Sequence, residues 1–192
     1  MMVKRPIVVV ALCMLFPLLP ACVPLAVTGV GAAALMATDR RTGGVYIEDQ
    51  NIELKALGVL HGYATAHVNA TSYNLTVLLT GEVPDAAAKK QIVDGVRAIP
   101  SVKNVVDETQ VSGVSSMASR GNDSLVTSNV KTRMLNNKVF NATQVKVFTE
   151  AGVVYLMGLV TRAEGDEAVF VTRNTSGVTR VVPLFEYIAA AS

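Results

Sequence analysis

The sequence predicts an α+β protein built from two small tandem domains, each with the element order helix, strand, strand, helix, strand. Its 192 residues are 51% apolar and 17% charged, which is enough apolar material for two small cores. Residues 68–83 align with residues 145–160 at a constant offset of 77. In both copies, alternating apolar residues are followed by apolar residues at helical spacing, which indicates one unit present twice.

Each copy begins its aligned region with two segments typical of paired strands. In the second copy, apolar residues alternate over 145–149 and again over 153–157. The Ala151-Gly152 pair between them suits a tight hairpin that needs positive φ. Asn74 holds the equivalent place in the first copy, and Asn tolerates that conformation better than most residues. We therefore expect a hairpin in each copy.

A helix is predicted after each hairpin. Ile92 and Val96 recur at helical spacing within residues 85–98, and Pro84 with Asp85 provides a start signal. The second copy repeats this less cleanly over residues 161–172, with a corresponding set of Ala163, Glu167 and Phe170.

The repeat unit is completed by a last strand and a first helix. Valine-rich runs over 102–111 and 178–185 follow the helices and predict the last strands. Helices are expected before the hairpins, over 51–60 in the first copy and 123–135 in the second.

The amino terminus has the layout of an export signal. Lys4 and Arg5 precede an almost wholly apolar run over residues 7–19. Thirteen residues fall short of the roughly 20 that a membrane-spanning helix needs. A transmembrane anchor that extends through residues 23–37 remains the alternative, although Pro24 weakens it.

The end of this segment, with Ala21 before Cys22 and Leu19 three residues before the cysteine, resembles a bacterial lipoprotein signal. Pro20 departs from the commoner small residue at that place. The resemblance implies that residues 1–21 are a signal peptide and that lipidation occurs at Cys22, which carries a diacylglyceryl thioether. Val23 after the cysteine implies, again by resemblance, sorting to the outer membrane.

Composition divides the rest of the chain into four parts. Residues 22–44 contain the amino terminus that the resemblance implies is lipidated, and the predominance of Ala, Gly and Val predicts a tether after it. The first copy covers 45–111 and the second covers 122–188. Residues 112–121 between them are rich in Ser and Gly and are expected to be a flexible linker.

The two copies resemble the BON domain. The motif residues are Gly152-Val-Val-Tyr-Leu-Met-Gly158 and Gly177-Val178, matched in the first copy by residues 74–81 and Ser101-Val102. This resemblance implies a three-stranded mixed sheet packed against two helices in each copy. With a lipidated cysteine ahead of two copies, the whole chain resembles the dual BON-domain outer-membrane lipoproteins of the YraP/DolP type. Members of that family are thought to engage anionic phospholipid through the first helix of the second copy.

The composition offers little for catalysis, metal binding or nucleic-acid binding. The chain has two Cys, two His and no Trp, and its net charge of +2 is far from that of a nucleic-acid reader. No nucleophile elbow, phosphate loop or dinucleotide fingerprint is present. His61 and His67 have no further ligand-type residues nearby in sequence, so we expect solvated or interfacial histidines, no metal and no cofactor.

Charge and apolar patterning favour the second copy as a membrane contact. Residues 45–110 carry a net charge of −3 and residues 120–188 a net charge of +2, although ordinary surface scatter would explain so small a difference. In the helix over 123–135, Val126, Val130 and Met134 should face the sheet. The outward positions are then the predicted phospholipid-binding residues Leu125, Ser128, Asn129, Lys131, Thr132 and Arg133.

Two further expectations concern this helix. Residues 122–124 are expected to cap its start, where backbone N–H groups would meet a lipid phosphate. The alternative for Leu125 is that it packs against the first copy.

The resulting hypothesis is a non-enzymatic periplasmic lipoprotein, anchored in the outer membrane, that binds anionic phospholipid and supports outer-membrane integrity. The rival hypothesis is an adaptor that binds proteins of an envelope assembly machine, because hairpins and final strands present edges to which a partner could add a strand.

Overall fold

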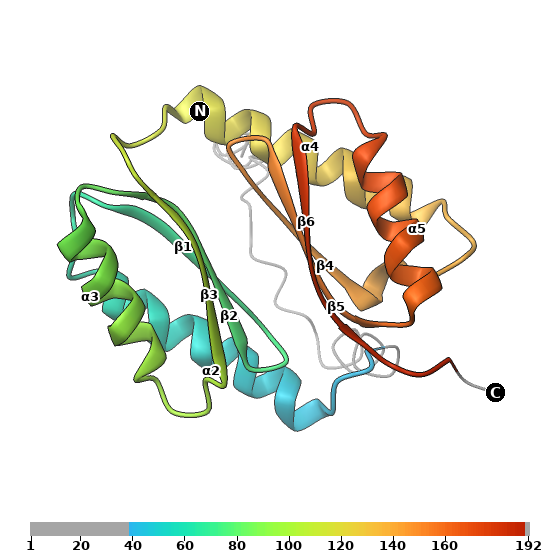
Figure 1. Ribbon diagram of the computed structural model, residues 1–192, viewed down its shortest axis with the longest axis horizontal. Helices are drawn as coiled ribbons and strands as arrows, with labels where there is room; N and C mark the ends of the chain where they lie inside the picture. Colours follow the sequence, from blue (N-terminus) through green and yellow to red (C-terminus); the bar gives the residue numbers. More distant parts are fainter. Residues whose placement is uncertain (1–38, 191–192) are drawn as a thin grey trace, which may run out of the picture. The chain divides into compact units, whose positions relative to one another are not determined.

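The structure is a computed structural model that describes residues 39–190 (Figure 1). The predicted signal peptide, Cys22 and most of the tether lie outside these residues. The first repeat contains α2 (Gly43–Leu60), β1 (His67–Tyr73), β2 (Thr76–Val83), α3 (Ala86–Arg97) and β3 (Asn104–Val111). The second contains α4 (Met117–Leu135), the short 3-10 helix η1 (Ala142–Gln144), β4 (Val145–Glu150), β5 (Val153–Val160), α5 (Arg162–Arg173) and β6 (Arg180–Tyr187). The predicted order of helix, strand, strand, helix, strand is confirmed in both repeats.

Each repeat folds around a mixed three-stranded sheet. The hairpin strands β1 and β2 pair antiparallel, and β3 then pairs with β2 in parallel, so that the order is β1-β2-β3. The second sheet has the same arrangement, β4-β5-β6. The parallel pair requires a crossover, which α3 and α5 provide. The predicted α+β class is therefore confirmed.

The two helices of each repeat cover one face of its sheet (Figure 1). In the first repeat, Ile52 of α2 and Ile92 of α3 meet Val77 and Leu79 of β2, and all four are fully buried. In the second, Val130 and Met134 of α4 join a corresponding core. Burial of each of these side chains stabilises the fold by about 1.5–3 kcal/mol.

The other face of each sheet packs against the other repeat. Tyr73 and Leu78 from the first repeat form one buried cluster with Tyr155 and Met157 from the second. The central strands β2 and β5 are consequently buried on both faces, which explains the three consecutive apolar residues Val77–Leu79 in β2 and the apolar side chains at seven of the eight positions of β5. The two repeats thus share a third core, and this face of each sheet would be exposed to solvent in an isolated repeat.

The end of the predicted tether is part of this folded unit. Thr42 caps α2, which begins at Gly43, eight residues before the predicted helix. Arg40 pairs with Glu164 of the second repeat at 2.7 Å, and Arg41 pairs with Asp49 of the first at 2.8 Å. Residues 39–44, which were expected to belong to the tether over residues 22–44, are therefore part of the folded unit and contact both repeats.

The sequence prediction for α5 is correct in extent and wrong in orientation. Its start is fixed by a capping box between Thr161 and Glu164. However, Ala163 and Phe170 are exposed, and Ala168 and Val171 face the core instead. The two sets lie on different sides of one helix, so the predicted apolar face was misplaced.

Both predicted hairpin turns adopt positive φ. The values are 50° at Ala151 and 75° at Gly152 in the second repeat, and 50° at Asn74 and 69° at Leu75 in the first. An aspartate from the preceding helix holds each turn: Asp49 in the first repeat and Asp123 in the second. The chain reverses at the positions that the sequence predicts, and a helix side chain stabilises each reversal.

Candidate functional site: the outer face of helix α4

Helix α4 is longer than the sequence predicts. It begins at Met117, and its amino-terminal cap is Ser116, whose side chain accepts a hydrogen bond from the Ser119 amide. Asn122 to Ser124 therefore lie inside the helix and do not cap it, and half of the expected flexible linker over 112–121 is helical. The idea that free backbone N–H groups at 122–124 meet a lipid phosphate is wrong, because these groups are inside the helix.

Asp123 has a different role from the one expected. Its carboxylate accepts hydrogen bonds from the backbone N–H groups of Ala151 and Gly152, at 2.9 and 2.8 Å. It is 6% exposed. This contact fixes α4 to the hairpin of β4 and β5 and so determines which face of the helix points away from the sheet.

The inward and outward faces of α4 are as predicted. Val126, Val130 and Met134 are at most 2% exposed and pack against the second sheet. The six predicted contact residues are all exposed: Leu125, Ser128, Asn129, Lys131, Thr132 and Arg133. Leu125 is 66% exposed, so it does not pack against the first repeat. Leu135, the last residue of the helix, is 69% exposed.

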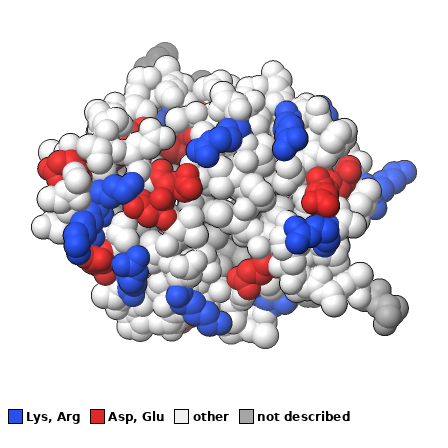
Figure 2. Space-filling view, viewed as in Figure 1, with Lys and Arg blue, Asp and Glu red and all other residues white. Residues whose placement is uncertain are grey.

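The cations on α4 are free of carboxylate partners. Within residues 39–190, neither Lys131 nor Arg133 forms an ion pair. Acidic and basic side chains are interspersed over the face drawn in Figure 2, without a continuous patch of one sign. The outer face of α4 thus combines two exposed leucines with unpaired cations whose aliphatic stems can lie on an apolar surface.

A cavity of about 320 Å³ adjoins the carboxyl-terminal end of α4. Met134 and Leu135 line it from the helix, and Tyr73 and Lys146 line it from the two sheets. Lys131 reaches the same cavity. The cavity therefore has apolar walls from Met134 and Leu135 and is also lined by the two lysines, Lys131 and Lys146.

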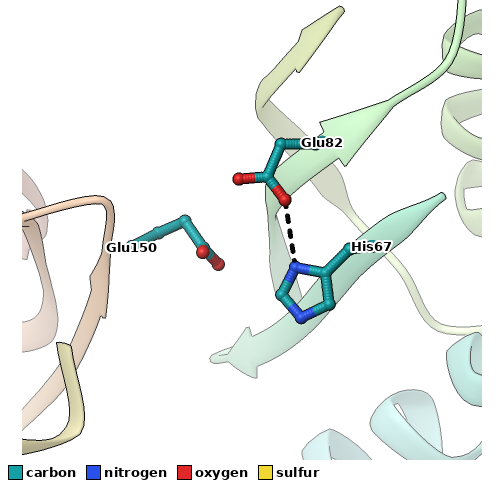
Figure 3. Close-up of side chains that lie close together, drawn as sticks. All are labelled: His67, Glu82 and Glu150. Carbon is teal, nitrogen blue, oxygen red and sulfur yellow. Dashed lines mark hydrogen bonds and ion pairs between the residues drawn. The ribbon is translucent and has the colours of Figure 1, made fainter. Parts of the chain in front are cut away.

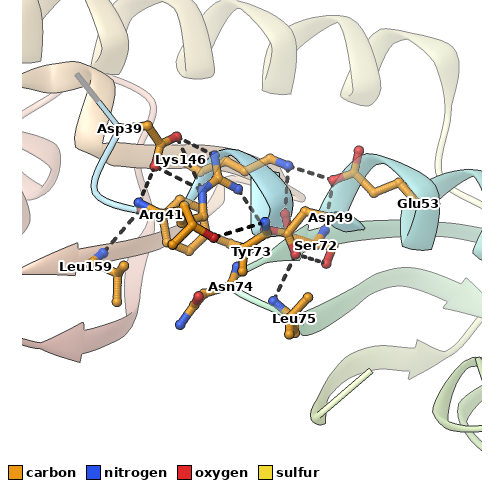
Figure 4. A network of polar contacts seen from close by, with 12 residues as sticks. Asp39, Arg41, Asp49, Glu53, Ser72, Tyr73, Asn74, Leu75, Lys146 and Leu159 are labelled. Atoms are coloured by element: carbon orange, nitrogen blue, oxygen red, sulfur yellow. Dashed lines mark hydrogen bonds and ion pairs between the residues drawn. The ribbon is translucent and has the colours of Figure 1, made fainter. Parts of the chain in front are cut away.

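An ion-pair network beside this cavity connects α2, β1 and β4 (Figure 4). The Arg41 guanidinium binds Asp39 and Asp49 and lies 4.1 Å above the centre of the Tyr73 ring. Burial opposes ionisation of Asp39, but hydrogen bonds from Arg41 outweigh it and lower the pKa of that carboxyl. Lys146 joins the repeats by donating to Glu53 at 2.6 Å and to the Ser72 carbonyl at 2.9 Å.

One group of ligand-type residues was missed by the sequence analysis. Glu82 and Glu150 lie beside His67, whereas the exposed His61 has no such neighbours among the described residues (Figure 3). The interfacial position expected of the histidines is confirmed for His67. The premise that nothing near His67 offers a metal ligand is wrong, because the fold brings residues 15 and 83 positions away to it.

The proximity of His67 and Glu82 could have been predicted from the sequence. A hairpin that turns at Asn74-Leu75 places His67 opposite Glu82, and the two are register partners in β1 and β2. Glu150 comes from the other repeat, and no local pattern predicts how the repeats pack.

The comparisons with known proteins agree with this fold. The BON-domain family model matches residues 48–113 and 122–189. The chain belongs to the BON-domain family. It is 36% identical over 174 residues to the outer membrane lipoprotein DolP of Haemophilus influenzae, covering 88% of this chain and 90% of that protein. The predicted resemblance to dual BON-domain lipoproteins of this type is thereby confirmed.

Two further relatives also match most of this chain. The 21 kDa hemolysin of Actinobacillus pleuropneumoniae is 31% identical over 157 residues, covering 78% of this chain and 79% of that protein. The osmotically-inducible protein Y of Escherichia coli is 26% identical over 144 residues, covering 72% of each chain. Each alignment therefore covers about three-quarters of both chains.

Among the helices of the described residues, none is both long and apolar enough to cross a bilayer.

Proposed function

We propose that this BON-domain protein is a non-enzymatic lipoprotein of the periplasmic face of the outer membrane. Cys22 carries the lipid anchor, and the outer face of α4 binds anionic phospholipid. In this way the protein supports outer-membrane integrity. The relationship to an outer membrane lipoprotein supports the location, and the lipoprotein-like sequence around Cys22 supports the anchor.

The observation that carries the lipid-binding proposal is the exposed face of α4. Leu125 and Leu135 are about two-thirds exposed, which leaves apolar area that insertion into a headgroup layer would bury. Lys131 and Arg133 flank them and have no carboxylate partner among residues 39–190. Each basic residue near an anionic surface contributes about 1 kcal/mol of attraction. Apolar burial and charge attraction would act at the same place.

A vesicle-binding measurement tests this proposal. The fragment Thr38–Ser192 lacks the anchor, so that its binding depends on the folded domains alone. We expect it to bind phosphatidylglycerol vesicles and to bind phosphatidylcholine vesicles more weakly. Leu125→Asp removes the apolar contact and adds a repelling charge, so the affinity should fall at least about tenfold.

Leu54→Asp on α2 is the matched control, because Leu54 is 67% exposed on the first helix of the other repeat. It introduces the same charge at a position of equal exposure, and its vesicle affinity should stay within about twofold of the unaltered fragment. Equal losses for the two variants would contradict binding through α4. Unchanged binding by Leu125→Asp would contradict it as well.

The adaptor alternative has one observation in its favour. Within residues 39–190, β3 and β6 each pair with a single neighbouring strand and therefore end their sheets. A partner protein could add a strand there. Capture of a defined envelope protein that survives Leu125→Asp and Lys131→Glu would favour this alternative over lipid binding.

A further inference from the structure

His67, Glu82 and Glu150 form a compact group at the junction of the two repeats (Figure 3). His67 lies in β1, Glu82 opposite it in β2, and Glu150 at the end of β4 in the second repeat. One ligand atom from each residue lies within 4.8 Å of the others. The His67 Nδ1 atom is 3.2 Å from the Glu82 carboxylate.

Within residues 39–190, no lysine or arginine forms an ion pair with either carboxylate of this group. Glu82 and Glu150 are each 8% exposed, and charged carboxylates are costly to bury without a counter-charge. Within the described residues, Glu150 has no ion pair and Glu82 has one only with His67.

We propose that His67, Glu82 and Glu150 bind a divalent transition-metal cation of the Zn²⁺ class, which joins the two BON domains. One imidazole and two carboxylates are ligands that Zn²⁺ accepts, and two carboxylates neutralise its charge. Water occupies the remaining coordination position. This proposal does not depend on lipid binding.

Polar neighbours orient the third ligand as they do in metal sites. Asn69 donates to Glu150 Oε2 at 2.9 Å, and the Thr80 hydroxyl lies 3.4 Å from the same oxygen. Such contacts to a ligating carboxylate restrict its rotamers and leave its other oxygen for the cation.

The distances and the access fit a cation. Bonds of about 2.0–2.1 Å in a tetrahedral site set the ligand atoms about 3.3 Å apart. The contact between His67 and Glu82 already has this spacing, so that only the Glu150 side chain has to move closer. A cavity lined by His67, Asn69 and Glu150 opens onto the group and offers a path for entry.

Because the ligands come from both repeats, the cation would couple their packing. Bound metal favours the state in which β1 and β4 are side by side, by an amount that grows with cation concentration. The site would therefore make the junction of the repeats responsive to metal.

The first experiment uses the unaltered full-length protein purified in detergent. ZnCl₂ is titrated by calorimetry and by backbone amide NMR, with MgCl₂ as the comparison, because Mg²⁺ prefers an all-oxygen octahedral site. We expect one Zn²⁺ per chain, with shifts centred on residues 67, 82 and 150. Absence of saturable Zn²⁺ binding, or shifts centred on residue 61, would overturn the proposal.

Variants then assign the ligands. Glu150→Gln retains an acceptor for Asn69, and His67→Gln retains a polar group beside Glu82, so that both should fold. Each should lower Zn²⁺ affinity at least about tenfold, whereas His61→Gln should leave it within about twofold. Equal affinity in all three variants, with native NMR spectra, would identify an adventitious ion and refute the site.

Discussion

The two BON domains build the same hairpin but hold it with unequal polar support. In the first, Asp49 is fully buried and accepts hydrogen bonds from the Ser72 hydroxyl and from the Asn74 and Leu75 amides, and it pairs with Arg41. In the second, Asp123 accepts from two amides only and has no ion pair within the described residues. The turn of the first domain is thus held by an aspartate that is also part of an ion pair, and the turn of the second is held by hydrogen bonds to an aspartate alone.

The first helices differ on their outer faces in a similar way. Both expose apolar side chains, since Leu54 on α2 is 67% exposed and Leu125 and Leu135 on α4 are 66% and 69% exposed. The charges around them differ, because α2 carries Glu48 and Glu53 and its only lysine, Lys55, is paired with Glu48. Helix α4 presents unpaired cations. Two helices with similar apolar exposure can therefore differ in their affinity for an anionic membrane, because the charges beside the apolar side chains attract or repel its surface.

Removal of the two capping carboxylates should give the largest difference between the domains. Asp49→Ala removes the acceptor of three buried donors and one of the two carboxylates that bind Arg41, so we expect a loss of about 3–5 kcal/mol in the free energy of unfolding. Asp123→Ala unpairs two amides and should cost about 1–3 kcal/mol. Urea denaturation measures both, and an equal loss would contradict the comparison.

The second-largest difference is expected from substitutions in the turns that precede the last strand of each domain. Gly177 has φ of 88°, and an added Cβ would lie 2.7 Å from Val126 Cγ2 of α4. Gly177→Ala should therefore cost about 2 kcal/mol. Ser101 holds the equivalent place at φ of 72° and is exposed, so Ser101→Ala should cost less than about 1 kcal/mol. Thermal unfolding measures the stability lost by each variant. A larger loss for Ser101→Ala than for Gly177→Ala would contradict this prediction.

The smallest effect concerns the segment before the first domain. The Arg40 hydrogen bonds lower the pKa of Glu164 from 4.5 to about 2. A carboxyl with a lowered folded-state pKa contributes stability above about pH 4.5, and this contribution is lost as the pH falls toward 2. No carboxylate occupies the matching helix position in the first domain, which is Ala88.

Arg40→Gln should consequently destabilise the protein at pH 6 and by less at pH 3, where Glu164 in the unaltered protein begins to lose this contribution. Urea unfolding at both pH values gives the two differences. A difference that is independent of pH would show that Arg40 acts by packing and not through the Glu164 charge.

Much of this molecule follows from local sequence. The repeat at an offset of 77, the alternation in the strands and the positive-φ positions gave both hairpins and the order of elements, because these depend on neighbours within a few residues. The outward face of α4 followed from the spacing of Val126, Val130 and Met134, which the structure buries. The start of the same helix did not follow, because Ser- and Gly-containing segments are equally compatible with a linker.

What the sequence by itself determined is the content of each domain: its elements, their turns, and the apolar side of α4. Only the tertiary structure decided how the domains meet, which buries the second face of both sheets, ties Arg40 and Arg41 to different repeats and brings Glu150 to His67. The physical reason is range. Periodicity and turn preferences act over a few residues, whereas contacts between residues some 80 positions apart depend on the shape and charge of surfaces that exist only after each domain has folded.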